Sequence, residues 1–368
     1  MDIFTAVVRH LLLIVVLLIH VPVFQAIIWS PASNVLLAGS KSHVTYIDSV
    51  SAGVQKAVQE CQHQFKWDKW NCPEASVFTN TQANREMSFV QAIASAGVMY
   101  SLVKNCSLGA FDDCGCDHRR NGDTGGEGWT WGGCSDNVRF GDRLATDIMD
   151  DSENSQGAIT VMNLHNNEAG RKAVKQTVMK TCKCHGVSGS CSLQTCWNHV
   201  ANFRTIGDEI KRKYFKAVRV DFVSGKLIDG NRPEDRITHA VISDSLNHRD
   251  LVFLDQSPDY CRANLTIGIT GTAGRECMLR EDVTASSSSP SSPLSVSLNK
   301  DSTSPASFRW VKQSCSRLCR SCGMEIRKTQ VVITSSCNCN FVWCCQVKCD
   351  TCRRTVTRRT CQPIGSML

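Results

Sequence analysis

The feature that most constrains this chain is its cysteine content. The 368 residues include 22 cysteines, an even number, and their spacing is uneven. None falls between Cys196 and Cys261, whereas residues 261–368 hold 12 of the 22. A segment so rich in cysteine is stabilised more by cross-links than by a large apolar core. The spacing therefore predicts two parts, of which the second depends on disulfides.

The amino terminus predicts export. Arg9 and His10 precede an apolar run over 11–19 that 21–24 extends, and the small residue Ala26 follows. This pattern is typical of a secretory signal peptide, here over residues 1–26, and it is shorter than the ~20 apolar residues of a membrane-spanning helix. No later stretch is expected to be long and apolar enough to span a membrane. Cysteines of an exported chain meet an oxidising compartment and pair as disulfides.

Two further patterns bear on that compartment. Asn105-Cys106-Ser107 and Asn264-Leu265-Thr266 are N-glycosylation sequons, which suit a secreted protein. Cys319-x-x-Cys322 and Cys349-x-x-Cys352 have the spacing of zinc ligands. Behind an export signal, however, disulfides are favoured over zinc, and we expect no metal.

Charge adds a hypothesis about partners. The formal net charge is +7, and between Lys312 and Arg359 ten lysines and arginines face only two acids, Glu325 and Asp350. Outside the cell such a surface suits sulfated glycans, such as heparan sulfate, or an acidic receptor. A solvated basic face without a partner explains it equally well. Nucleic acid is not an expected ligand of an exported protein.

Apolar spacing predicts helices from residue 46 to about 218. Residues recur every three or four positions, which buries one stripe of each helix. The Gly-rich stretch 121–133 is predicted to be a loop, and Ser135 or Asp136 is expected to cap the third helix. The repeating positions are Val50, Val54, Val58, Cys61 and Phe65; Phe89, Ile93, Ala96, Tyr100 and Val103; Phe140, Leu144 and Ile148; and Trp197, Val200, Ile206, Ile210 and Tyr214.

The last third has a different pattern. Residues 330–333 are strand-like and 337–349 continue in extended form, which indicates long hairpins. Residues 284–307 are mostly Ser, Pro and Thr, and we expect a mobile insert there. The predicted fold is α+β: a helical amino-terminal domain (27–255) followed by a disulfide-rich, cystine-knot-like β-hairpin domain (256–368).

A resemblance appears at residues 182–191 (CKCHGVSGSC), followed by Gln194-Thr195-Cys196-Trp197. This segment resembles the signature of the Wnt family of secreted morphogens. Two departures stand out, the insert at 284–307 and Val342, where many relatives carry His. Other blocks match the family in order: WDKWNC (67–72), WGGCSDN (131–137), HNNEAGR (165–171), SPDYC (257–261) and CNCNFVWCCQVKCDTC (337–352).

The resemblance implies a lipid on Ser190. In the family the matching serine is esterified with an unsaturated fatty acid by a membrane acyltransferase, and a carrier accompanies the protein during secretion. The acyl chain then enters the cysteine-rich domain of a Frizzled receptor. Bonds Cys182–Cys196 and Cys184–Cys191 are implied at this hairpin, whose Gly186 and Gly189 are expected to be free to adopt positive φ. No other cofactor is expected.

The resemblance also implies a second receptor contact and the other disulfides. The tip Phe341, Val342, Trp343, Cys344 and Cys345 is expected to grip the opposite side of the Frizzled domain, with a vicinal Cys344–Cys345 bond. Adjacent Cα atoms lie ~3.8 Å apart across a trans peptide, so that bond has to bend its peptide. The other implied pairs are Cys61–Cys72, Cys106–Cys114, Cys116–Cys134, Cys261–Cys322, Cys277–Cys315, Cys319–Cys361, Cys337–Cys352 and Cys339–Cys349.

The sequence thus predicts a secreted developmental ligand in the extracellular space, the matrix and at the cell surface. Frizzled and an LDL-receptor-related co-receptor would be its partners, and stabilisation of β-catenin its output. One alternative is a secreted matrix protein that binds sulfated glycans without signalling. Another is a hydrolase using His185 and a nearby serine. Residues 186–190 (GVSGS) lack the final Gly of the G-x-S-x-G motif, so we expect no catalytic residues.

Overall fold

The computed structural model describes residues 41–74, 82–151, 153, 157–230, 246–278, 314–342 and 346–365. The chain divides into two compact units, which are described separately. One contains the described parts of residues 1–58 and 77–255, and the other those of 59–76 and 256–368. The second of these ranges begins at Gln256. Residues 59–76, which the sequence assigned to the helical domain, group with the carboxyl-terminal unit instead.

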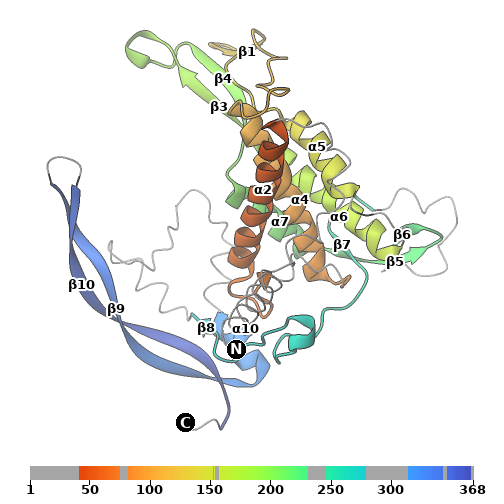
Figure 1. The fold of residues 1–368 in the computed structure, drawn as a ribbon, viewed down its shortest axis with the longest axis vertical. Coiled ribbons are helices and arrows are strands. Elements are labelled where there is room, and N and C mark those ends of the chain that lie inside the picture. Colours follow the sequence, from red (N-terminus) through yellow and green to blue (C-terminus); the bar gives the residue numbers. More distant parts are fainter. Residues whose placement is uncertain are drawn as a thin grey trace, which may run out of the picture. The chain divides into compact units, whose positions relative to one another are not determined.

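The amino-terminal unit is built around helix α4 (Arg85–Ser107), which packs against α5 (Val138–Asp150), α6 (Ala158–Gln176) and α7 (Phe203–Tyr214) (Figure 1). Helix α2 (Lys41–Phe65) crosses α4 where Gly53 meets Gly97. A Cβ on Gly97 would lie 2.4 Å from the Gly53 carbonyl oxygen, so the two backbones could not approach this closely with any larger residue.

By length and apolar composition, α4 could cross a membrane, contrary to the expectation from sequence. Its buried residues lie all round the helix, and they include Phe89, Ile93, Met99 and Leu102, none of which is exposed. A helix that is apolar on every side is typical of the centre of a helical core as much as of a membrane span. In this unit α4 is the core helix.

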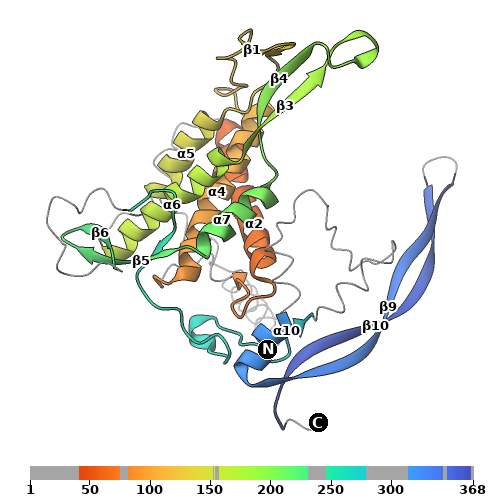
Figure 2. The same ribbon diagram turned by 180° about the vertical axis from the view of Figure 1, so that it is seen from behind.

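Two small sheets complete the amino-terminal unit. In the first, strands β1 (Thr124–Gly126), β2 (Trp129–Trp131), β3 (Val178–Cys184) and β4 (Gln194–Val200) lie in the order β1-β2-β4-β3. The β3–β4 hairpin projects beyond the ends of the helices in both views (Figures 1 and 2). The second sheet has the order β6-β5-β7, with strands at Val218–Val223 (β5), Lys226–Asp229 (β6) and Val252–Phe253 (β7).

The carboxyl-terminal unit has a core of cystines. Short helix α10 (Ser314–Leu318) and strand β8 (Glu276–Cys277) bring Cys277, Cys315, Cys319 and Cys361 together around Leu318, all buried. A hairpin of β9 (Met324–Val342) and β10 (Gln346–Pro363) extends from this core. Strand β8 pairs with β10 at Arg359 and Thr360, near the end of the hairpin that adjoins the core.

Residues 59–76 join this second unit for a visible reason. The Arg275 guanidinium donates to the carbonyl oxygens of Asp68 and Lys69 at 2.7 and 2.6 Å, and Arg317 pairs with the Asp68 carboxylate at 2.9 Å. Burial disfavours the charged form of both guanidinium groups and so lowers the pKa of Arg275 and of Arg317. These contacts bind the segment after α2 to the cystine core.

The predicted fold class is confirmed, with several corrections in detail. Trp197 and Val200 lie in strand β4, so the predicted helix there begins only at Phe203. Helix α5 is capped by Asn137, whose side chain accepts from the Phe140 N–H at 3.1 Å, rather than by Ser135 or Asp136. The predicted loop 121–133 contains the short strands β1 and β2.

Ten disulfides are described, and they join the same cysteines as the resemblance implied. Cys344–Cys345, the signal peptide (1–26) and the Ser/Pro-rich insert (284–307) lie outside the described residues. The cysteines with zinc-like spacing each have a disulfide partner, and a disulfide sulfur is not the thiolate that zinc binds. The pairs are Cys61–Cys72, Cys106–Cys114, Cys116–Cys134, Cys182–Cys196, Cys184–Cys191, Cys261–Cys322, Cys277–Cys315, Cys319–Cys361, Cys337–Cys352 and Cys339–Cys349.

Candidate functional site: the Ser190 hairpin and the carboxyl-terminal tip

Ser190 lies in the loop that connects β3 to β4, and two nested disulfides close this loop. Cys182 and Cys196 face each other across the two strands, and Cys184–Cys191 closes the loop again seven residues apart in sequence. The Ser190 side chain is exposed. Two cross-links over so short a span restrict the loop to few conformations, which fixes where its hydroxyl lies.

The loop ends in one turn of 3-10 helix, η3 (Val187–Gly189). The Ser190 N–H donates to the Val187 carbonyl at 3.1 Å, and the Gly186 N–H donates to the Ser190 carbonyl at 2.8 Å. Ser188 and Gly189 both have positive φ, 58° and 77°. The left-handed conformation is easy for Gly189 and costs energy at Ser188, so the backbone bonds must maintain it.

Gly186 has a role that differs from the expected positive φ. Its φ is −64°, which any residue can adopt. A Cβ there would lie 2.0 Å from the Ser190 Oγ and 2.5 Å from the Ser190 carbonyl oxygen. Only glycine leaves room for Ser190 to fold back across the base of the turn.

A neighbouring hairpin that the sequence did not predict supports the loop. Strand β2 runs parallel to β4, and the Gln194 N–H donates to the Gly128 carbonyl at 2.9 Å. The Lys180 ammonium lies 4.0 Å from the ring centroid of Trp129, a cation–π contact. The signal that could have revealed this support is Trp-Thr-Trp at 129–131, an alternating aromatic pattern within the Gly-rich stretch.

Apolar side chains flank Ser190. Val187 is 91% exposed and Leu193 is 54% exposed, in a loop with no core of its own. Exposed apolar groups gathered at a rigid tip are characteristic of a binding surface.

The Ser190 hydroxyl lies beside another serine, Ser192. The Ser190 Oγ lies 3.1 Å from the Ser192 Oγ, and the His185 backbone N–H donates to the Leu193 carbonyl at 2.7 Å. Among the described residues, no hydrogen bond joins the His185 ring to either serine. A nucleophilic serine needs such a base within hydrogen-bond reach.

The second expected contact lies at the far end of the β9–β10 hairpin. Phe341 and Val347 face each other across the strands and are 73% and 64% exposed, and Val342 beside them is 37% exposed. Disulfides Cys337–Cys352 and Cys339–Cys349 cross-link the strands just below. Trp343, Cys344 and Cys345 lie outside the described residues. The described side chains nevertheless form an exposed apolar end on a hairpin whose two strands are joined by disulfides.

The two sequons lie in different environments. Asn264 is exposed, and its Oδ1 accepts from the Thr266 N–H at 3.2 Å. Asn105 lies on α4, is half-buried and donates its Nδ2 to the Ser49 Oγ at 2.6 Å. Since Nδ2 is the atom that carries a glycan, Asn264 is the more accessible site in the folded chain.

Comparison with known proteins identifies the family. The wnt family model matches residues 35–288 and 306–362. The chain belongs to the Wnt family. It is 45% identical to Protein Wnt-8 of Xenopus laevis over 95% of this chain and 93% of the relative, and 48% identical to human Wnt-8b over 90% and 89%.

A solved structure agrees with this membership. In human WLS in complex with WNT8A, the matching chain is 41% identical, with a TM-score of 0.61 over 89% of this chain and 98% of that one. Wnt proteins are secreted signalling ligands rather than enzymes. The exposed Ser190 loop and the apolar tip are therefore surfaces of a secreted signalling ligand.

Proposed function

We propose that this Wnt protein is a secreted morphogen that carries an unsaturated fatty acyl group on Ser190 and inserts it into a Frizzled cysteine-rich domain. The observation that carries the proposal is the loop itself. The Ser190 hydroxyl is exposed on a doubly cross-linked turn that projects beyond the helices, where an acyltransferase could reach it.

The energetics favour a protein groove as the destination of the acyl chain. A chain of about fourteen methylenes gains on the order of 10 kcal/mol when fully buried, at ~0.8 kcal/mol each. A single acyl chain nevertheless anchors a protein to a membrane only marginally. Transfer into a receptor groove therefore suits it better than permanent anchoring. Val187 and Leu193 would extend the apolar contact around the attachment point.

The apolar end of the β9–β10 hairpin is the proposed second contact on the same receptor domain. Phe341, Val342 and Val347 are exposed there, and burying exposed apolar side chains is what gives an interface most of its energy. Trp343, Cys344 and Cys345 complete the proposed tip. An LDL-receptor-related co-receptor would then join the complex, and β-catenin would be stabilised in the responding cell.

The proposal includes a carrier before secretion. The similar WNT8A chain was solved in complex with WLS. We propose that a carrier of the same kind takes this protein, after acylation, from the acyltransferase to the cell surface. Glycans on Asn264 and Asn105, and association with the cell surface and the matrix, belong to the same proposal.

Peptide mass spectrometry of protein secreted by animal cells tests the lipid. We expect a fatty-acyl mass on the peptide that contains Ser190, removed by mild ester cleavage. Ser190→Ala should abolish both that mass and Frizzled-domain binding, while the matched control Ser192→Ala retains them. Secreted, folded Ser190→Ala protein that signals at full strength would contradict the proposal.

A further inference from the structure

The Asp136 carboxylate lies buried where the base of the β3–β4 hairpin meets the end of helix α4. From the hairpin, the Val200 N–H donates to it at 2.7 Å and the His199 Nδ1 lies 3.2 Å away. From α4, the Ser107 hydroxyl donates to it at 2.7 Å and the Lys104 ammonium lies 3.0 Å away. Burying a carboxylate is costly unless it is paired and hydrogen-bonded, and here the partners come from two elements. A single side chain thus joins the hairpin to the helical core.

The backbone beside Asp136 extends the sheet to the same point. The Gly132 N–H donates to the Cys196 carbonyl at 2.9 Å. Further along β4, the Asp136 N–H donates to the Asn198 carbonyl at 2.9 Å, and the Asn198 N–H donates to the Ser135 Oγ at 3.2 Å. Because β2 already runs parallel to β4, these bonds continue that pairing to the base of the hairpin.

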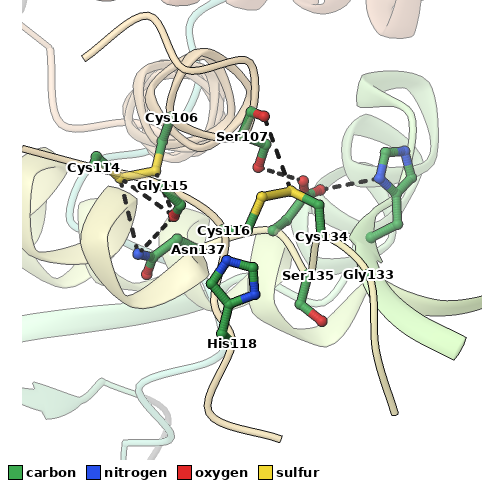
Figure 3. The surroundings of a disulfide bond; sticks show 12 residues. Cys106, Ser107, Cys114, Gly115, Cys116, His118, Gly133, Cys134, Ser135 and Asn137 are labelled. Atoms are coloured by element: carbon green, nitrogen blue, oxygen red, sulfur yellow. Dashed lines mark hydrogen bonds and ion pairs between the residues drawn. A yellow bond between two sulfur atoms is a disulfide. The ribbon is translucent and has the colours of Figure 1, made fainter. Parts of the chain in front are cut away.

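Two disulfides attach this segment to the end of α4 (Figure 3). Cys106–Cys114 joins the last turn of the helix to the loop that follows it. Cys116–Cys134 then ties that loop to the chain two residues before Asp136. A segment that is cross-linked on one side and paired with β4 on the other leaves the Asp136 carboxylate little freedom to move. Its partners on α4 and on β4 are therefore held in a fixed relation.

A small tilt at this base is amplified at the tip of the hairpin. Strand β3 has 7 residues, so at ~3.3 Å per residue the loop that contains Ser190 begins roughly 23 Å from the base. A tilt of about 10° would then move Ser190 by roughly 4 Å. Strands β1 and β2 do not correct the tilt, because they belong to the same sheet as β4 and move with it. The direction of the tip is therefore decided where β4 meets α4.

We propose that Asp136 is a positioning residue for the proposed receptor interaction, on which this inference rests. By fixing the direction of the β3–β4 hairpin, it allows the acyl group on Ser190 and the apolar end of the β9–β10 hairpin to engage one Frizzled domain at the same time. Two linked contacts strengthen binding only when the geometry permits both at once. A hairpin held in the wrong direction keeps its lipid and loses that gain.

A double-mutant cycle on the full-length, secreted protein tests the inference. Asp136→Asn keeps an oxygen for the Val200 N–H and removes the negative charge. Each variant is made with and without Phe341→Ala, which removes a side chain of the second contact. The matched control is Asp142→Asn, which also removes a carboxylate paired with a lysine, here Lys175 at 2.6 Å. Among the described residues, the ion-pair partners of Asp142 lie on α6 rather than on the hairpin.

Binding to an immobilised Frizzled cysteine-rich domain and acylation of the Ser190 peptide are measured for each protein. We expect Asp136→Asn to retain acylation within about twofold, because the disulfides of the tip are unchanged, and to bind about tenfold more weakly. In the Phe341→Ala background the same substitution should weaken binding by less than about twofold, because one remaining contact does not depend on direction. Asp142→Asn should stay within about twofold of its parent in both backgrounds.

Equal weakening in the two backgrounds would show that Asp136 acts through stability alone and would overturn the inference. Unchanged binding of Asp136→Asn, or loss of its acylation, would do the same. His199→Ala decides the question if Asp136→Asn is not secreted, because His199 is half-exposed and its loss leaves the other partners of Asp136 in place. It should show the same pattern with about threefold weaker binding, and unchanged binding there overturns the inference. Wild-type protein without an acyl group on Ser190 would contradict the proposed function and this inference together.

Discussion

Gly186 and Gly189 flank the same turn at Ser190, but for different physical reasons. Gly189 has a φ of 77°, and a Cβ added to it would meet no atom within 4 Å, whereas Gly186 has an ordinary φ and no free space. The sequence marks both glycines and predicts positive φ for each. It cannot distinguish a constraint on a torsion angle from a constraint on space, because the second depends on where Ser190 and Ser192 lie after the chain has folded.

Substitution by alanine should therefore have different effects at Gly186 and at Gly189. Gly186→Ala should displace Ser190, because the new Cβ would lie 2.0 Å from the Ser190 Oγ, and acylation of Ser190 should fall severalfold or more. Gly189→Ala adds only strain of about 1–2 kcal/mol and should leave most of the acylation intact. Quantitative mass spectrometry of the Ser190 peptide, in protein with correct disulfides, makes the comparison. Equal acylation of the two variants would contradict it.

At the scale of single elements, α6 shows how a polar helix face can be structural. Its HNNEAGR segment was recognised only through the resemblance, since polar residues (Asn163, Asn166, Asn167 and Arg171) share the buried face with apolar ones such as Met162 and Val174. The Asn166 side chain donates to the Val252 carbonyl and accepts from the Val252 N–H, both at 3.0 Å. The side chain of Asn166 thus makes the two hydrogen bonds that a neighbouring strand would otherwise make with Val252 of β7. Apolar periodicity does not reveal that these polar positions are buried.

Asn166→Ala should therefore destabilise the amino-terminal unit strongly. The substitution leaves both backbone groups of Val252 buried without partners, at about 1–3 kcal/mol each, or roughly 2–6 kcal/mol together. The matched control is Asn163→Ala on the same helix, which loses one hydrogen bond of 2.9 Å, to Glu153, and should cost only about 1 kcal/mol. Chemical denaturation followed by far-UV circular dichroism gives the two values. A control as destabilised as the Asn166 variant would contradict this account.

His165 on α6 makes the stability depend on pH. Burial disfavours the charged ring and lowers the pKa of His165 below 6.5, with the nearby His248 and Lys172 acting in the same direction. The Asp250 carbonyl, 3.0 Å from Nε2, and Glu168 oppose this shift. Below about pH 6.5 the unfolded chain binds a proton that the folded chain resists, so stability falls as the pH falls from 6.5 toward the lowered pKa.

The corresponding variant is His165→Gln, which keeps a hydrogen-bond donor but does not titrate. Its thermal unfolding midpoint should fall less than that of the wild type between pH 7.5 and pH 5. His118→Gln, at an exposed position, is the control and should follow the wild-type curve. Parallel curves for wild type and His165→Gln would show that another group causes the loss.

At the scale of the whole molecule, composition predicted the two parts but not all of their membership. Residues 59–76 belong with the cystine core because Arg275 and Arg317, more than 200 residues later, bind the backbone there. The apolar spacing likewise predicted a helix at Trp197 and Val200, because a spacing of three residues suits a helix. Pairing with strand β3 decides their conformation instead. Contacts between distant segments are what local patterns omit.

Within the carboxyl-terminal unit, the core and the upper hairpin should respond differently to the loss of one cross-link. Cys319–Cys361 closes 42 residues and lies at the centre of the carboxyl-terminal core, whereas Cys339–Cys349 closes 10 residues on the exposed hairpin. Loop entropy alone assigns about 4 kcal/mol to the first bond and about 3 kcal/mol to the second. Cys319→Ala/Cys361→Ala also removes two fully buried sulfurs from a core that consists mainly of cystine and Leu318.

Hydrogen exchange followed by mass spectrometry distinguishes these effects. Cys319→Ala/Cys361→Ala should remove protection throughout α10, β8 and the base of β9–β10, because few apolar side chains remain there to maintain the core. Cys339→Ala/Cys349→Ala should affect only the upper hairpin, since the other cystines still fix its base. Amides of α4, which has its own apolar core, should stay protected in both and serve as the internal reference. If the first variant kept its protection in α10 and β8, side-chain packing rather than cystine would have to be the main source of stability in the carboxyl-terminal unit.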